Sequence, residues 1–201
     1  MSKLNLEIPE QAYELIRDQI GVIITDELRN QFVTFGDPDL DIQNIFSERF
    51  VNFDKTELPA INIIYSGGSY DNQDSLTVDG HYTYNIDVEV SNKTTDLSRG
   101  DVASRRKLHK ILGKIRAIIM SPYYQTLGFQ MPFIGNRKFN NMQIDTTTIQ
   151  QDGINSAFGR LTLEVRVVEE AQGITPINAS GYDTDVRLNE TEQGFRYEFN
   201  N

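Results

Sequence analysis

The strongest structural signal in this chain is the ten-residue stretch His81-Tyr82-Thr83-Tyr84-Asn85-Ile86-Asp87-Val88-Glu89-Val90. Apolar and polar residues alternate through it, and a period of two is typical of an antiparallel strand with one buried face. The face predicted to be buried holds Tyr82, Tyr84, Ile86, Val88 and Val90. The face predicted to be exposed holds Thr83, Asn85, Asp87 and Glu89.

The segments on either side of this strand predict an α+β fold: a mainly antiparallel sheet packed by two helices, with an extended C-terminal tail. A shorter strand is expected at 58–65, where Pro59 favours an edge or first position. The Gly-rich stretch that follows predicts a polar loop over 66–80. Further strands are predicted at 43–53, 142–150 and 158–168, and helices at 10–32 and 98–120. Gly36-Asp37-Pro38 is the predicted stop of the first helix, and Ser98 with Asp101 forms a possible capping box for the second.

The second helix is strongly basic. Its apolar stripe consists of Leu108, Ile111, Leu112, Ile115, Ile118 and Ile119. Seven Arg or Lys and one Asp between 99 and 116 give this segment a charge of +6, which leaves −16 for the rest of the chain. Such a face can be simply solvated, can meet an acidic protein surface, or can bind nucleic acid. A basic and an acidic face on one protomer are complementary in a head-to-tail ring.

Composition restricts the classes of function. Nineteen basic and twenty-nine acidic residues give the 201-residue chain a net charge of −10, which disfavours nucleic-acid binding by the protein as a whole. The absence of cysteine excludes disulfides, thiolate metal sites and a cysteine nucleophile. No apolar run approaches the length of about 20 residues that spans a bilayer. Residues 1–7 lack the apolar core of a secretory signal. A protein made and used in a cytoplasm is therefore expected.

Candidate chemical sites are weak. His81 and His109 have no partners at triad or metal-ligand spacing, so no catalytic role is expected for either. The stretch at 66–69 lacks the Gly-Lys-Ser/Thr of a phosphate loop. Asp37, Asp39, Asp41 and Glu48 echo the spacing of a calcium loop, but Ile42 stands where that motif needs glycine, so a solvated capping loop is favoured. Asp87 and Glu89 could serve acid–base chemistry but are expected on the wet side of the sheet. We predict no catalytic, cofactor-binding or metal-binding residues.

Residues 1–168 are predicted to form a single domain and residues 169–201 an extended tail. The tail contains seven acidic and two basic residues and few aliphatic ones. Phe195, Tyr197 and Phe199 alternate with charged residues, which predicts a lone strand, disordered in the free protein, that adds to a sheet edge on a neighbour.

The order of elements over about 45–170 resembles the tail terminator (tail completion) proteins of tailed bacteriophages. The residues that carry the resemblance are Leu58-Pro59-Ala60-Ile61-Asn62-Ile63, the strand from Tyr82 to Val90, the amphipathic helix after it, and the closing strand from Leu161 to Val167. The chain departs from the family pattern by its tail and by its segment 66–80. Related folds occur in neck (head-tail connector or head completion) and tail-tube proteins, which are the alternatives. A small hydrolase and a host-encoded adaptor are the competing classes.

The resemblance implies a structural virion protein, assembled in the host cytoplasm. Its subunits would form a six-membered ring that caps the tail tube of a contractile or non-contractile tail and docks to the neck. Its partners would be other copies of itself, the tail-tube protein, a sheath where the tail has one, and neck or connector proteins. DNA would pass through the lumen without specific binding, and neither cofactor nor membrane would be involved. The interface candidates are Arg105, Arg106, Lys110, Phe195, Tyr197 and Phe199, and the lumen candidates are Asp87, Glu89 and Glu164.

Overall fold

The structure, a computed structural model, describes residues 10–73, 77–93, 99–130, 132–145, 148–149, 154–170, 183–187 and 194–198. The helices are α1 (Ala12–Phe35) and α2 (Gly100–Met120), with short 3-10 turns η1 (Pro38–Leu40), η2 (Lys55–Glu57) and η3 (Pro122–Tyr124). The strands are β1 (Asn44–Ser47), β2 (Ala60–Gln73), β3 (Thr77–Lys93), β4 (Ile134–Ile144), β5 (Thr148–Ile149), β6 (Ile154–Glu170), β7 (Asp183–Arg187) and β8 (Gly194–Glu198).

The main sheet has the strand order β1-β2-β3-β6-β4, and β5 pairs with β6. Only the pairing of β1 with β2 is parallel, and the other pairings in this sheet are antiparallel. The predicted fold class is therefore confirmed: the chain is an α+β protein with a mainly antiparallel sheet packed by two helices.

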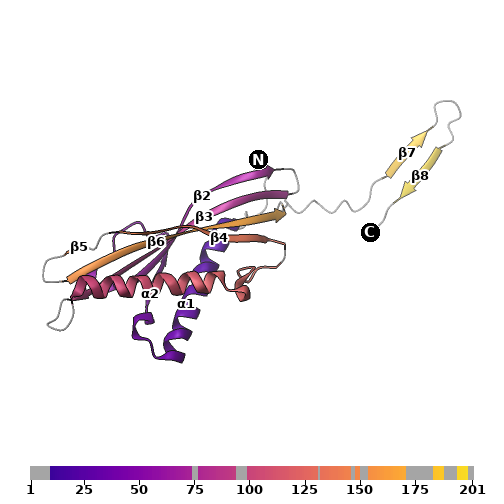
Figure 1. Ribbon diagram of the computed structural model, residues 1–201. Coiled ribbons are helices and arrows are strands. Elements are labelled where there is room, and N and C mark those ends of the chain that lie inside the picture. Colours follow the sequence, from indigo (N-terminus) through magenta and orange to yellow (C-terminus); the bar gives the residue numbers. More distant parts are fainter. Residues whose placement is uncertain are drawn as a thin grey trace.

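Both helices lie on the same face of the sheet (Figure 1). α1 packs over β1 and β2, whereas α2 packs over β3 and β6. The predicted buried face of the long strand is confirmed, because Tyr82, Tyr84, Ile86, Val88 and Val90 are all buried. The predicted stripe of α2 is also buried, except that Ile118 is only half-buried. Each fully buried aliphatic side chain contributes roughly 1.5–3 kcal/mol to the core.

The predicted loop at 66–80 is wrong. β2 continues to Gln73 and β3 begins at Thr77, so the described residues of this segment extend the main sheet. β2 pairs with β3, with bulges after Tyr65 and Tyr70, and residues 77–80 of β3 also pair with β6. Gly68 serves close packing, because a β-carbon there would lie 2.7 Å from Cδ1 of Tyr82, whereas Gly67 adopts a φ of 137° at the bulge. Glycine inside a strand commonly marks such a close approach.

Two other strands differ from prediction. The strand predicted at 43–53 stops at Ser47, because Glu48 takes a left-handed conformation with φ 55° and turns the chain out of the sheet. The strand predicted at 142–150 is the end of β4, which begins at Ile134, followed by the short β5. β4 is an edge strand whose side chains are mostly exposed, so its sequence lacks the apolar alternation that would reveal it.

The predicted boundaries are close to those of the structure. α1 spans 12–35 rather than 10–32 and ends at Gly36 in the left-handed conformation, as the predicted stop signal requires. α2 begins after Arg99, and the predicted capping residue Ser98 lies outside the described residues. β6 runs two residues past the predicted domain boundary at 168. None of the helices that the structure describes is long and apolar enough to cross a membrane.

Candidate interaction surfaces

The basic helix α2 has one side whose cations are bonded within the chain and another side whose cations are not bonded to any described residue. On the side toward α1, Lys110 Nζ donates to Asp37 Oδ1 at 2.7 Å and to Asp39 Oδ2 at 3.0 Å, and Lys114 Nζ donates to Gln31 at 3.0 Å. The hydrogen bond from Lys110 holds the pKa of Asp37 below its ordinary value. Lys110, a predicted interface residue, is thus engaged within its own chain.

The acidic loop from Asp37, for which the sequence favours a capping role over calcium binding, takes part in the same contacts. Asp37 accepts the backbone N–H of Asp39 and caps η1, and both carboxylates face Lys110. Within the described residues, no group of three or more His, Asp or Glu side chains is placed to hold a metal ion. The hydrogen bond that Asp37 accepts from the backbone of Asp39 is the one expected of a capping loop.

On the other side of α2, the arginines have no partners. Arg105, Arg106 and Arg116 are exposed and make no ion pair with any described residue. Arg105 and Arg116 lie with Val102 and His109 on one helical ridge that points away from the lysines, because successive residues advance by about 100°. Arg106 lies beside this ridge, on the side nearer to Lys110. We call this surface the arginine face, formed by Val102, Arg105, Arg106, His109, Arg116 and Met120. Arg116 was not among the sequence candidates, although its place on the ridge of Arg105 and His109 could have found it.

The sheet face opposite the helices carries the predicted lumen candidates. Asp87 is buried, with 6% of its surface exposed, although the sequence predicts it on the wet face. The cause is Arg160 on β6, whose Nε and Nη2 donate to the two carboxylate oxygens at 2.6 and 2.7 Å. Glu89 is half-buried and has no ion-pair partner among the described residues, and burial raises the pKa of its carboxyl.

Glu164, the third lumen candidate, is the centre of a polar cluster on the same sheet face. Its carboxylate contacts Lys138 Nζ at 2.8 Å and Asn140 Nδ2 at 2.8 Å, and these hydrogen bonds lower its pKa. His81 lies between two carboxylates: Nε2 is 3.0 Å from Asp71, and Nδ1 is 3.1 Å from Glu164 but outside hydrogen-bond geometry. Sequence spacing gave no sign of these neighbours of His81, because they come from different strands. Ion pairs with Arg160 and Lys138 partly neutralise the carboxylates of Asp87 and Glu164 on this face.

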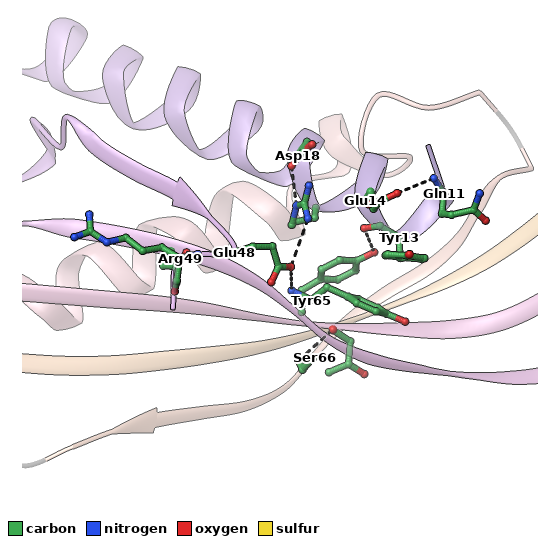
Figure 2. Close-up of polar contacts among 12 residues, drawn as sticks. Gln11, Tyr13, Glu14, Asp18, Glu48, Arg49, Tyr65 and Ser66 are labelled. Atoms are coloured by element: carbon green, nitrogen blue, oxygen red, sulfur yellow. Dashed lines mark hydrogen bonds and ion pairs between the residues drawn. The ribbon is translucent and has the colours of Figure 1, made fainter. Parts of the chain in front are cut away.

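The opposite edge of the molecule is organised by Glu48, which sequence reasoning did not select for this role. Its Oε1 accepts the backbone N–H of Tyr65 at 2.7 Å and lies 3.6 Å from Nη1 of Arg17 on α1 (Figure 2). Arg17 also contacts Asp18 at 2.8 Å. Tyr13 stacks on Tyr65 with ring centroids 4.7 Å apart. These contacts join α1 to the edge formed by β1 and β2.

A groove follows the outer side of α1 along this edge. Two cavities of about 300 and 460 Å³ share Thr25 in their linings. We call them together the acidic groove, lined by Asp18, Val22, Asp26, Val33, Asp41 and Ile45. Arg29 is the cation among the lining residues. Asp26 makes no ion pair with any residue that the structure describes.

Several apolar side chains are exposed, among them Val22 and Val33 in the acidic groove and Val102 and Met120 on the arginine face. Five belong to α1 or the loop after β1: Val22, Val33, Phe35, Phe50 and Val51. Four belong to α2, to η3 or to β4: Val102, Met120, Tyr123 and Met142. The loop after β1 is held rigidly, because Arg49 makes a two-point ion pair with Glu57 and its backbone bonds Asn62 twice. Apolar residues on a fixed loop suit contact with another protein.

The predicted lone strand in the tail is wrong. β8 pairs with β7 in an antiparallel two-stranded sheet, with Val186 opposite Phe195 and Thr184 opposite Tyr197. Phe199 lies outside the described residues. The strand itself is present where the alternation predicted it, but its partner is in the same chain.

No protein-family model matches this chain, and a search of curated proteins finds no relative.

Proposed function

We propose that this protein is a tail terminator of a tailed bacteriophage: copies of the chain form a ring that caps the tail tube and offers a docking surface to the neck. The observation that carries the proposal is the order β2, β3, α2, β4, β6, in which a long alternating strand is followed by a basic helix packed on the sheet. This is the order of elements on which the resemblance to that family rests.

The two charged surfaces support a ring. Residues 10–43 contain eight acidic and two basic residues, whereas residues 99–116 carry +6. α1 packs near one edge of the sheet and α2 covers strands toward the other edge. Opposite charge on opposite sides of one protomer favours head-to-tail association, which closes into a ring when the rotation between subunits permits.

The polar sheet face supports DNA passage without binding. Its arginines and Lys138 are paired with carboxylates of the same chain, as in the contacts of Arg160 with Asp87 and of Arg166 with Asp79. Cations engaged in this way are poorly placed to neutralise phosphates, which is the main source of non-specific DNA affinity. A lumen lined by this face would let DNA slide through.

Light scattering after size exclusion and negative-stain electron microscopy test the proposal on the purified full chain. We expect closed rings with a central opening that do not lengthen with time or concentration. Tubes of indefinite length would favour the tail-tube alternative, and a monomer at the highest concentration reached would contradict the proposal. In the virus that encodes the chain, loss of the gene should give tails of abnormal length without heads.

A further inference from the structure

The arginine face and the acidic groove lie on opposite sides of the helical layer. On α2, Lys110 and Lys114 point toward α1 and its flanking turn, and the ridge with Arg105 and Arg116 is turned away from them. On α1, Gln31 points toward α2, whereas Asp26 lines the groove against β1. A single protomer therefore cannot bring the two surfaces together.

Each surface combines charge with exposed apolar side chains. Val102 and Met120 flank the arginines and are each 41% exposed, and Val22 and Val33 in the groove are 52% and 71% exposed. Protein interfaces typically pair such apolar centres with polar rims rather than relying on charge alone. Nucleic acid would use the arginines but would leave the exposed apolar side chains of both surfaces uncovered.

The charges that remain after internal pairing are complementary. Asp37 and Asp39 form ion pairs with Lys110, and the remaining charged residues between 10 and 43 are six acidic and two basic ones. Arg105, Arg106 and Arg116 remain on α2 without partners. Asp18, Asp26 and Asp41 in the groove are exposed, and of these Asp18 is ion-paired with Arg17, whereas Asp26 and Asp41 make no ion pair with a described residue. The acidic excess of the groove and the arginine excess of α2 therefore remain largely uncompensated among the described residues.

We infer that the arginine face of one copy docks into the acidic groove of the next copy, with Arg105 and Arg116 directed at Asp18 and Asp26. This inference rests on the proposed ring and names the surfaces that would build it. The contact is heterologous, so each subunit uses one surface for each neighbour and the chain of contacts continues until it closes. Lys110 has no part in it.

Charge-swapped variants of the full chain provide the test. Arg105→Glu with Arg116→Glu reverses the arginine face, and Asp18→Arg with Asp26→Arg reverses the groove. In sedimentation velocity at low salt, each double variant alone should associate about tenfold or more weakly than the wild type, since like charges then face each other. A one-to-one mixture of the two variants should recover assembly, because reversed faces meet reversed grooves and the unchanged surfaces meet each other.

The matched control is Lys55→Glu with Lys93→Glu, which changes the net charge by the same amount as the arginine-face variant on exposed residues outside α2. It should assemble like the wild type. Circular dichroism and urea unfolding show whether each variant is folded. If the arginine-face variant proves unfolded, Arg105→Gln with Arg116→Gln replaces it. Rings that form normally from both reversed variants would overturn this inference but leave the proposed function standing. A monomeric wild type would overturn both.

Discussion

Asp87 and Arg160 form a two-point ion pair across β3 and β6, with donor–acceptor distances of 2.6 and 2.7 Å. The two partners are unequally exposed, because 9% of the Asp87 side chain and 37% of the Arg160 side chain reach solvent. Arg160 can turn to water if its partner is lost, whereas Asp87 cannot. The pair therefore predicts an asymmetric response to mutation.

Arg160→Ala should destabilise the protein by about 3 kcal/mol, because it leaves a nearly buried carboxylate without a counter-ion. Asp87→Ala should cost only about 1 kcal/mol, since a partly exposed guanidinium regains water. Urea denaturation of both single variants and the double variant measures these costs and the coupling between the residues. Equal losses in the two single variants would contradict the asymmetry.

Glycine 80 should tolerate no side chain. A β-carbon there would lie 2.5 Å from the carbonyl oxygen of Ser69. Gly80→Ala therefore forces β2 and β3 apart and should lower the free energy of unfolding by about 1–3 kcal/mol. Gly113 in α2 is the control, since nothing lies within 4 Å of its added β-carbon. Gly113→Ala should stabilise by up to about 1 kcal/mol through helix propensity. Thermal unfolding at low protein concentration compares the two. An unchanged unfolding temperature for Gly80→Ala would show that β2 and β3 are loosely packed at this point.

Glu89→Gln should stabilise the protein at neutral pH. Burial raises the pKa of this carboxyl, so the folded state holds its proton more tightly than the unfolded chain does. The stability linked to Glu89 is complete below its ordinary pKa of about 4.5 and is lost as pH rises through the raised value. The gain at pH 7 should stay below about 1 kcal/mol, because water still screens a half-exposed group.

Glu164→Gln is the control of opposite sign. Lys138 and Asn140 lower the pKa of Glu164, so its contribution is present above the ordinary pKa and is lost as pH falls through the lowered value. This variant should be less stable than the wild type at pH 7 and should converge with it in acid. Chemical denaturation between pH 3 and pH 8 follows both variants. The same dependence of stability on pH in Glu89→Gln and Glu164→Gln would contradict the opposite pKa shifts of the two carboxyl groups.

Lys110 should matter to the protomer and not to the ring. Lys110→Ala removes both contacts to η1, so the backbone N–H groups of Leu40 and Asp41, which close that turn, should exchange faster with solvent. The sedimentation of the assembled protein should not change. Weaker assembly without faster amide exchange in η1 would instead show that Lys110 contributes to the interface between subunits, as predicted from the sequence.

The parts of the fold that were predictable are those in which one face is buried. Tyr82 to Val90 and the apolar stripe of α2 carry a clear period, and both were placed within a few residues. β4 was misplaced because its residues are mostly exposed and its register is broken near Gly135 and Asn140. The polar contacts of the candidate surfaces were harder to predict from the sequence, because ion pairs such as Asp87 with Arg160 join residues 73 positions apart. Which cations on α2 are free depends on such pairs.

β8 should gain stability only when the protein assembles. A two-stranded sheet is at best marginally stable on its own in water, and no third strand pairs with β7 or β8 among the described residues. Burying a strand against a neighbour could overcome the cost of ordering it, which is about 1–2 kcal/mol per residue for the backbone alone. Amides at 194–198 should therefore exchange quickly in the free protomer and become protected on assembly.

Hydrogen exchange read by mass spectrometry distinguishes the two states when the protein is compared at dilute and assembling concentrations. β6 is the internal control, because its amides are paired on both sides by β3 and β4 and should be protected in each state. A chain ending at Glu170 tests the same point: it should fold normally but associate more weakly than the full chain. Strong protection of 194–198 in the dilute protein would instead mean that the pair β7–β8 is stabilised within the protomer, and the tail would then have no need of a partner.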